Sequence, residues 1–269
     1  MRLKILLKST KKDFQIPINY NYALSSALYK IFYESSPEFA SWLHDQGFVA
    51  RDGKRLKLFT FSRLFVHDFK QEREIIKGTR NCWFLFSSPF KTEIVENLII
   101  GIFKRSRIII ANRSVSSEFR VQNIEHIEDP KFVREMDYIM LSPTVTSTMK
   151  ELNGKVYEHF YRVDEEGIEE ALANNLLKKY EIVNKSTYNG ELRIELDREY
   201  IRSKGGAEGV SKMVTIAEGS ERETRVKGFM CPIKITADVE MQKVAYECGI
   251  GKKNGLGFGM LEVVNRTLK

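Results

Sequence analysis

Two halves of this chain show the same order of β-prone and helical segments, and this order limits the fold more than any other feature. In the first half we expect a strand over 2–8, a helical region over 23–46, strands near 58–67 and 82–88, a helix over 89–103, and strands near 107–110 and 118–122. In the second half we expect a strand over 137–141, a helix over 165–179, a strand over 191–197, a long hairpin tip or mobile loop over 203–227, a strand over 229–235, a helix over 238–247, and a strand within 258–264. Both halves follow the β-α-β-β-α-β order of a ferredoxin-like domain.

The predicted fold is therefore α+β, with two tandem ferredoxin-like (RRM-like) domains that contain antiparallel sheets. A chain of 269 residues is long enough for two such domains, each with its own core. We place the domains at residues 1–126 and 127–269, because the segment Glu128–Pro130 suits a boundary. The aromatic RNP consensus with which RNA recognition motifs stack bases is absent, so stacking on the sheet faces is not indicated.

The tail from Cys248 to Met260 contains five glycines around Lys252 and Lys253. Glycine has no Cβ, so several backbone N–H groups can turn toward one anion while the lysines supply charge. The glycine spacing does not fit a dinucleotide-binding fingerprint, and no Gly-Lys pair is followed by Ser or Thr as in a Walker loop. The pattern is compatible with a loop that faces phosphates and with plain turn chemistry.

Charge is distributed unevenly along the chain, which carries a net charge of +7. Residues 1–126 hold 21 Lys and Arg against 12 Asp and Glu, whereas residues 127–269 hold 22 against 24. A concentrated basic half suits a polyanionic partner such as RNA, although solvated lysines on a basic protein would give the same numbers. No apolar run is long enough to cross a bilayer, and residues 2–9 do not resemble a secretory signal, so we expect a cytoplasmic protein with no membrane partner.

His44 is the residue most suited to chemistry. Ser36 is placed to cap a short helix, Pro37 to begin it and Gly47 to end it, which puts His44 in its last turn. There the helix dipole favours a positively charged imidazole. An imidazole, a phenol and lysines beside an RNA phosphate are sufficient for cleavage by the adjacent 2′-OH without a metal. By residue type alone, His44 is also compatible with a surface histidine at a helix end.

Metal and disulfide chemistry find little support in the sequence. Cys82, Cys231 and Cys248 are widely spaced and form no C-x-x-C pair, and no clustered His and carboxylate spacing occurs. We therefore expect no metal and no cofactor. The residues that we predict to bind RNA are basic side chains near His44 and in the presumed hairpin, together with the tail: Lys54, Arg55, Arg202, Lys204, Lys212, Arg222, Arg225, Lys227, Gly249, Gly251, Lys252, Lys253, Gly255 and Gly257.

Several segments together resemble a known family. The segment ALYKIFYESSPEFASWLHDQG, the run KLFTFS, the tripeptide LSP at Leu141–Pro143 and the tail GIGKKNGLGFGMLEV are similar to those of the CRISPR repeat-processing endoribonucleases. These enzymes belong to the repeat-associated RNA-binding superfamily, with tandem ferredoxin-like domains and a C-terminal glycine-rich loop. The resemblance implies metal-independent cutting of the precursor CRISPR transcript within each repeat, which leaves a 2′,3′-cyclic phosphate and a 5′-hydroxyl.

The resemblance also implies catalytic residues. By position, the family's tyrosine, histidine and lysine match Tyr29, His44 and Lys57. His44 would then be the base or the acid, Tyr29 would orient the 2′-OH or share proton transfer, and Lys57 would stabilise the phosphorane. Lys54 is an alternative for the lysine, and His67 is a reserve candidate for the histidine.

The implied partners are precursor CRISPR repeat RNA and a CRISPR interference complex that receives the products, with the protein acting as a monomer or a homodimer. A second interpretation is a catalytically inactive RNA-binding subunit of a CRISPR effector complex, because related proteins share the fold and the glycine loop. His44 in a capped helix near several cations favours the nuclease, because a passive binder does not need it.

Overall fold

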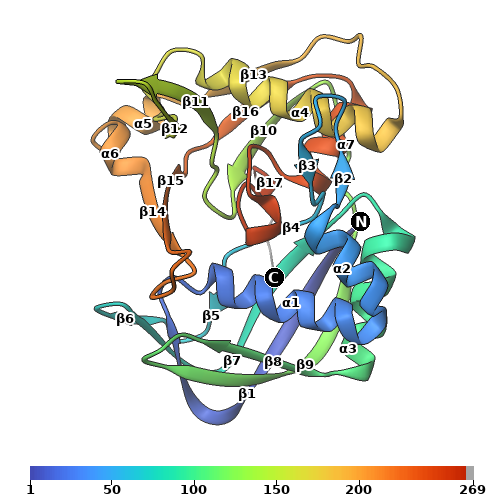
Figure 1. Ribbon diagram of the computed structural model, residues 1–269, viewed down its shortest axis with the longest axis vertical. Coiled ribbons are helices and arrows are strands. Elements are labelled where there is room, and N and C mark those ends of the chain that lie inside the picture. Colours follow the sequence, from blue (N-terminus) through green and yellow to red (C-terminus); the bar gives the residue numbers. More distant parts are fainter. Residues whose placement is uncertain (265–269) are drawn as a thin grey trace.

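Two antiparallel sheets with helices account for most of residues 1–264, which the computed structural model describes (Figure 1). The elements before residue 130 are β1 (Arg2–Pro17), α1 (Asn21–Ser35), α2 (Pro37–Asp45), β2 (Phe48–Val49), β3 (Arg55–Leu56), β4 (Thr60–Phe61), β5 (Phe65–Val66), β6 (Lys70–Glu72), β7 (Ile75–Ser87), the π-helical turn η1 (Lys91–Glu96), α3 (Asn97–Lys104), β8 (Arg107–Ala111) and β9 (Ser116–Ile127). The later elements are β10 (Glu135–Met140), β11 (Ser147–Leu152), β12 (Lys155–Phe160), α4 (Ile168–Asn184), β13 (Arg193–Leu196), α5 (Arg198–Ser203), α6 (Ala207–Val210), β14 (Ser211–Ile216), β15 (Thr224–Phe229), β16 (Ile233–Thr236), α7 (Val239–Cys248), the 3-10 turn η2 (Asn254–Leu256) and β17 (Leu261–Val263).

The N-terminal sheet has the strand order β4-β7-β1-β9-β8, in which β8 is an additional edge strand beside a ferredoxin-like arrangement. Along β1 the side chains alternate, and Leu3, Ile5 and Leu7 point into a core shared with α1 and α3. This alternation follows from the two-residue period of a strand. The aromatic rings of Phe32, Phe59 and Phe86 pack together in that core, at centroid separations of 5.4 to 6.4 Å.

The C-terminal sheet has the order β13-β16-β10-β17, which is the ferredoxin-like arrangement without an additional strand. Helices α4 and α7 pack on one of its faces. Two hairpins interrupt this domain: β11–β12 lies between β10 and α4, and β14–β15 lies between β13 and β16. The tandem ferredoxin-like fold and its antiparallel sheets are thus confirmed. We keep 1–126 and 127–269 as the proposed domain ranges, because β9 ends at Ile127 and β10 begins at Glu135.

Several sequence predictions need correction in detail. The helix expected to end at Lys179 continues to Asn184, so its lysines lie inside the helix and do not complement its C-terminal dipole. The first strand reaches Pro17 because it pairs with the long β7. The segment 203–227 contains a true hairpin as well as a loop, whereas the β11–β12 hairpin was not expected at all.

Arg2 joins the two domains through a buried ion pair. Its Nη1 donates a hydrogen bond to Glu262 of β17 at 2.9 Å, and its Nη2 donates to the backbone carbonyl of Tyr246 at 2.7 Å. The guanidinium also lies 3.4 Å from the ring centroid of Tyr246. Neither Arg2 nor Glu262 has any solvent exposure. Beside this pair, Leu85 and Met260 pack together across the same interface.

We predict that Arg2→Met lowers the free energy of unfolding by about 3–5 kcal/mol, because it removes the cation from a fully buried carboxylate. The double variant Arg2→Met/Glu262→Leu should recover much of this loss, since no charge then remains buried. Urea unfolding midpoints of the two variants and the wild type measure both effects. A single variant as stable as the wild type would show that the ion pair does not hold the domains together.

Candidate active site and basic groove

Tyr29 lies in α1 at the edge of the N-terminal core. Its ring packs edge-on against the rings of Phe32 and Phe59, with centroids 6.1 Å away in each case. Burial raises the pKa of Tyr29 above its usual value. The phenol therefore keeps its proton at neutral pH and can act as a hydrogen-bond donor or an acid.

His44 lies in the last turn of α2, as the capping residues predicted. Ser36 accepts a hydrogen bond from the backbone N–H of Phe39, Pro37 is the first helical residue, and Gly47 follows with a left-handed φ of +61°. The His44 side chain is 70% exposed, and its Nδ1 lies 2.7 Å from Asp45 Oδ1. When Nδ1 donates its proton to Asp45, Nε2 is left as an acceptor that can take a proton from a substrate.

Lys57 stabilises the C-terminal end of α2. Its Nζ donates hydrogen bonds to the backbone carbonyls of Leu43 and His44, which are among the last carbonyls of that helix and favour a cation. Burial of the half-buried side chain lowers the pKa of Lys57. The ammonium therefore fixes the position of His44 and brings a positive charge next to it.

A pocket of about 290 Å³ brings the three residues together. Tyr29, His44 and Lys57 line it, along with Arg55, Lys253 and the turn η2. The ring centroids of Tyr29 and His44 are 5.4 Å apart. Lys54 does not line this pocket, so the geometry favours Lys57 over Lys54 as the residue beside His44. We call it the His44 pocket.

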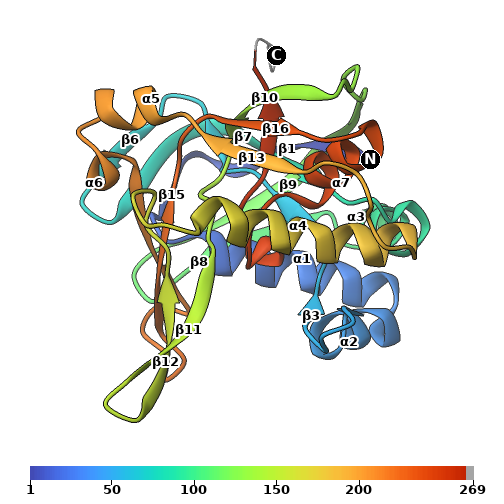
Figure 2. The ribbon, with the colours of Figure 1, turned by 90° about the horizontal axis from the view of Figure 1, so that it is seen from above.

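A second, larger pocket adjoins the His44 pocket and is strongly basic. It has a volume of about 560 Å³, and we call it the basic groove. Its lining includes five cations and one acid, Glu170; the cations are Lys54, Arg55, Lys178, Lys252 and Lys253. Arg55 and Lys253 line both pockets. Figure 2 shows α4 in the foreground, with the β11–β12 hairpin projecting on one side of it and β3 and α2 on the other.

Lys178 was not found by sequence reasoning, because a lysine inside an amphipathic helix gives no signal. Its Nζ lies 2.7 Å from Asp52 Oδ2 in the turn between β2 and β3, and this hydrogen bond lowers the pKa of Asp52 to about 2. The contact ties the turn that carries Lys54 to the C-terminal domain.

The glycine-rich loop is buried between the domains. A Cβ on Gly257 would lie 2.2 Å from the ring of Phe61, and a Cβ on Gly255 would lie 3.2 Å from the side chain of Lys57. The carbonyl of Gly255 accepts a hydrogen bond from Ser25, and that of Phe258 accepts one from Thr60. The close approach of the loop to the N-terminal domain therefore accounts for Gly255 and Gly257 without any contact with RNA.

The tip of the same loop reaches the groove. Gly249 and Gly251 are also buried, and both have a positive φ. Lys252 and Lys253 are partly exposed, and they line the basic groove. Lys252 donates a hydrogen bond to Ser147, and burial lowers its pKa. Contact between RNA and the backbone of Gly249, Gly251, Gly255 or Gly257 stays a prediction.

Lys179 supports this loop from inside α4. Its Nζ is fully buried and donates hydrogen bonds to the carbonyls of Gly249 and Gly251 and to Asn254 Oδ1, at 2.7 to 2.9 Å. Burial lowers the pKa of Lys179 to about 7. The three acceptors oppose that effect, because only the ammonium form offers three donors. Sequence reasoning did not separate this residue from the partly exposed Lys178.

The remaining predicted RNA-binding residues lie elsewhere. Neither the His44 pocket nor the basic groove includes Arg202 and Lys204 at the end of α5, or the four residues of the β14–β15 hairpin, which are Lys212, Arg222, Arg225 and Lys227. The tip of this hairpin instead meets the start of α1, where Asn19 accepts a hydrogen bond from the backbone of Thr215. Their role in RNA binding stays a prediction.

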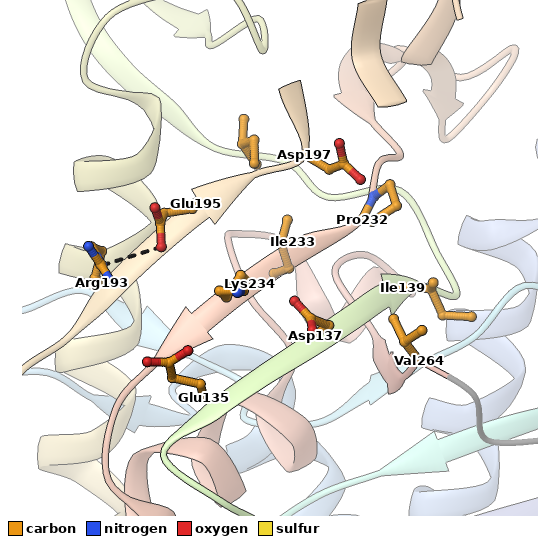
Figure 3. Close-up of a pocket in the computed structure, with 11 residues that line it drawn as sticks. Glu135, Asp137, Ile139, Arg193, Glu195, Asp197, Pro232, Ile233, Lys234 and Val264 are labelled. Atoms are coloured by element: carbon orange, nitrogen blue, oxygen red, sulfur yellow. Dashed lines mark ion pairs between the residues drawn. The ribbon is translucent and has the colours of Figure 1, made fainter. Parts of the chain in front are cut away.

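The open face of the C-terminal sheet holds another pocket, of about 650 Å³ (Figure 3). Its acidic residues outnumber its basic ones: Glu135, Asp137, Glu195 and Asp197 against Arg193 and Lys234. A phosphate backbone would be repelled there. This agrees with the expectation that the sheet face does not stack bases.

The metal-ligating residues, cysteines and helices of residues 1–264 form no further candidate site. No group of three or more His, Cys, Asp or Glu in this part of the chain is arranged to hold a metal ion. Its three cysteines are buried and unpaired. Within the same range, no helix combines the length and apolar character needed to cross a membrane. His67 lies on the surface between β5 and β6 and pairs with Asp68, away from the His44 pocket.

Comparison with known proteins gives consistent matches. Residues 15–125 match the family model described as CRISPR-associated protein Cas6, N-terminal, and residues 127–263 match CRISPR associated protein Cas6, C-terminal. The chain is 27% identical to CRISPR-associated endoribonuclease Cas6 1 of Methanocaldococcus jannaschii, over 97% of this chain and 92% of that protein. It is 26% identical to CRISPR-associated endoribonuclease Cas6 of Pyrococcus furiosus, over 100% of this chain and 92% of that one. A solved structure named CRISPR associated protein Cas6 superposes with a TM-score of 0.76 at 25% identity, and covers 98% of this chain and 99% of its own.

Lys179→Met should lower the free energy of unfolding by about 3 kcal/mol, because it leaves three buried acceptors without a donor. Lys178→Met is the matched control: the same change one residue earlier removes only a partly exposed ion pair and should cost at most about 1 kcal/mol. Denaturant unfolding of both variants measures the difference. Equal costs would mean that Lys179 does not organise the glycine-rich loop.

Proposed function

Because this chain belongs to the Cas6 family, we propose that it is an endoribonuclease that cuts precursor CRISPR RNA within its repeats. The observation that carries the proposal is the His44 pocket, which holds a histidine, a tyrosine and a lysine and opens beside the basic groove. The groove would bind the phosphate backbone through its five cations, and the pocket would receive the phosphate that is cut.

The proposed reaction is attack of the ribose 2′-OH on the adjacent phosphorus. His44 Nε2 accepts the proton of the 2′-OH as the new P–O bond forms. The ammonium of Lys57 stabilises the negative charge of the phosphorane. As the P–O bond to the 5′-oxygen breaks, that oxygen takes a proton from Tyr29. Tyr29 then regains a proton from water and His44 releases its proton to water, so both groups return to their starting states. The products are a 2′,3′-cyclic phosphate and a 5′-hydroxyl, and no metal takes part.

The protonation of Tyr29 and the hydrogen bonding of His44 support these roles. Burial raises the pKa of Tyr29, so the phenol is protonated and unsuited to be the base, and its proton is the one available to the leaving oxygen. The pairing of His44 Nδ1 with Asp45 leaves Nε2 free to accept a proton. A catalytically inactive RNA-binding subunit would need the basic groove but has no need for this set in one pocket.

We predict that His44→Ala slows cleavage of repeat RNA about 10²- to 10⁴-fold, because proton transfer commonly contributes that much to a rate. Binding should change little, since the groove is untouched. His67→Ala is the matched control: His67 is similarly exposed and similarly paired with the aspartate that follows it. Single-turnover cleavage and binding assays compare the two variants. Equal effects on cleavage would remove His44 from the mechanism.

A change in the substrate tests whether the 2′-OH is the nucleophile. A single 2′-deoxyribose immediately 5′ of the cut should abolish cleavage and leave affinity nearly unchanged, because only the nucleophile is missing. Wild-type protein in EDTA should still cut the unmodified repeat and leave cyclic phosphate ends, which mass spectrometry identifies. Cleavage of the deoxy substrate would exclude 2′-OH attack, and binding without any cutting would favour the inactive subunit.

A further inference from the structure

The β11–β12 hairpin projects from the C-terminal domain beside the basic groove (Figure 2), and its two faces differ in chemistry. The register pairs Thr148 with His159 and Lys150 with Tyr157. Because side chains alternate along a strand, these four residues share one face. Tyr161, which follows β12, continues the same alternation, and its backbone N–H is bonded to the carbonyl of Thr146. We call this the aromatic face.

Three rings follow one another along the aromatic face. The centroids of Tyr157 and His159 are 6.5 Å apart, and those of His159 and Tyr161 are 5.8 Å apart. The rings meet edge to face, at interplanar angles of 86° and 71°, so they do not cover each other by stacking. Tyr157 is 42% exposed although it is aromatic. A ring held in water beside a basic groove is the kind of platform on which an unpaired base stacks.

Charge separates the two faces of the hairpin. Lys150 and Lys155 lie on the aromatic face, and its strand residues include no acid. Glu165, which follows the hairpin, lies 2.6 Å from His159 and 3.8 Å from Lys150, and so holds the histidine ring in place. The opposite face carries two acids, Glu151 and Glu158. The strand residues of the aromatic face thus carry two cations and no acid, which suits a polyanion better than the opposite face with its two acids.

The aromatic face is continuous with the basic groove. Thr148 and Tyr161 belong to this face and also line the groove. A strand in the groove can thus reach the rings past Thr148 and Tyr161. Lys252 and Lys253 lie nearer the opposite face, where Lys252 donates a hydrogen bond to Ser147 and Lys253 pairs with Glu158 at 3.6 Å.

We propose that the aromatic face of the β11–β12 hairpin binds unpaired ribonucleotides by stacking their bases, and so holds a single-stranded part of the RNA that enters or leaves the basic groove. The identity of the RNA in this inference rests on the proposed function. The stacking contact itself does not. Unpaired bases are required, because bases inside a duplex are stacked on each other and do not expose their faces to a protein ring.

A binding experiment tests this on the full-length protein. The probe is a fluorescently labelled oligoadenylate of about 12 nucleotides, which is in the range of single-strand site sizes. Tyr157→Ala should bind it about 10-fold more weakly than the wild type, and Tyr157→Phe should bind like the wild type because it keeps the ring. Val156→Ala is the control on the opposite face, where Val156 is 63% exposed, and it should have no effect.

Salt dependence separates stacking from charge. Tyr157→Ala should leave the slope of log K against log salt unchanged, whereas Lys150→Gln should reduce it by about 0.7, as expected for one lost phosphate contact on a single strand.

Wild-type affinity in Tyr157→Ala, or an equal loss in Val156→Ala, would overturn the inference. A drop in oligomer mass by light scattering with unchanged RNA affinity would also overturn it, because the face would then bind a second copy of the chain.

Cleavage of repeat RNA by the wild type is measured separately. If the wild type cuts the repeat but Tyr157→Ala binds oligoadenylate normally, only this inference fails. If binding depends on Tyr157 but no repeat is cut, only the proposed nuclease activity fails.

Discussion

The packing of the glycine-rich loop against the N-terminal domain is the interaction on which the site depends. Gly257 allows the loop backbone to approach the ring of Phe61 more closely than a residue with a Cβ would permit, and Gly255 leaves room for the side chain of Lys57. From within α4, Lys179 binds three acceptors of the same loop. The loop is thus held from both domains, and its exposed part supplies Lys253 to both the His44 pocket and the basic groove. Movement between the domains would separate Lys253 from His44.

A second constraint acts at the end of α2. The last carbonyls of a helix carry partial negative charge, and Lys57 satisfies two of them with its ammonium. The same group therefore orders the turn that holds His44 and places a positive charge where a phosphorane would form. Tyr29 enters from α1, whose ring contacts with Phe32 and Phe59 are part of the core. Helix capping and core packing therefore hold these three residues in place.

Local chemistry made part of this structure predictable from the sequence. The Ser36, Pro37 and Gly47 signals located α2 and placed His44 in its last turn, and the segment order gave the fold. Contacts between distant residues were not predictable. Lys178 and Lys179 are identical in type and adjacent, yet one borders the groove and the other is buried, because only the packing of α4 against the loop distinguishes them. The β11–β12 hairpin was missed because both faces of its strands mix polar and apolar residues, so no clear period-two pattern appears.

The distribution of charge in space differs from its distribution along the chain. The second half of the sequence has slightly more acids than bases, whereas the first half is basic. Three of the five groove cations, Lys178, Lys252 and Lys253, nevertheless come from that second half. Several of its acids lie instead on the open sheet face and on one side of the β11–β12 hairpin. Folding therefore separates acids from bases within one domain, and a polyanion is directed to the groove between the domains because the other concave surface of that domain repels it.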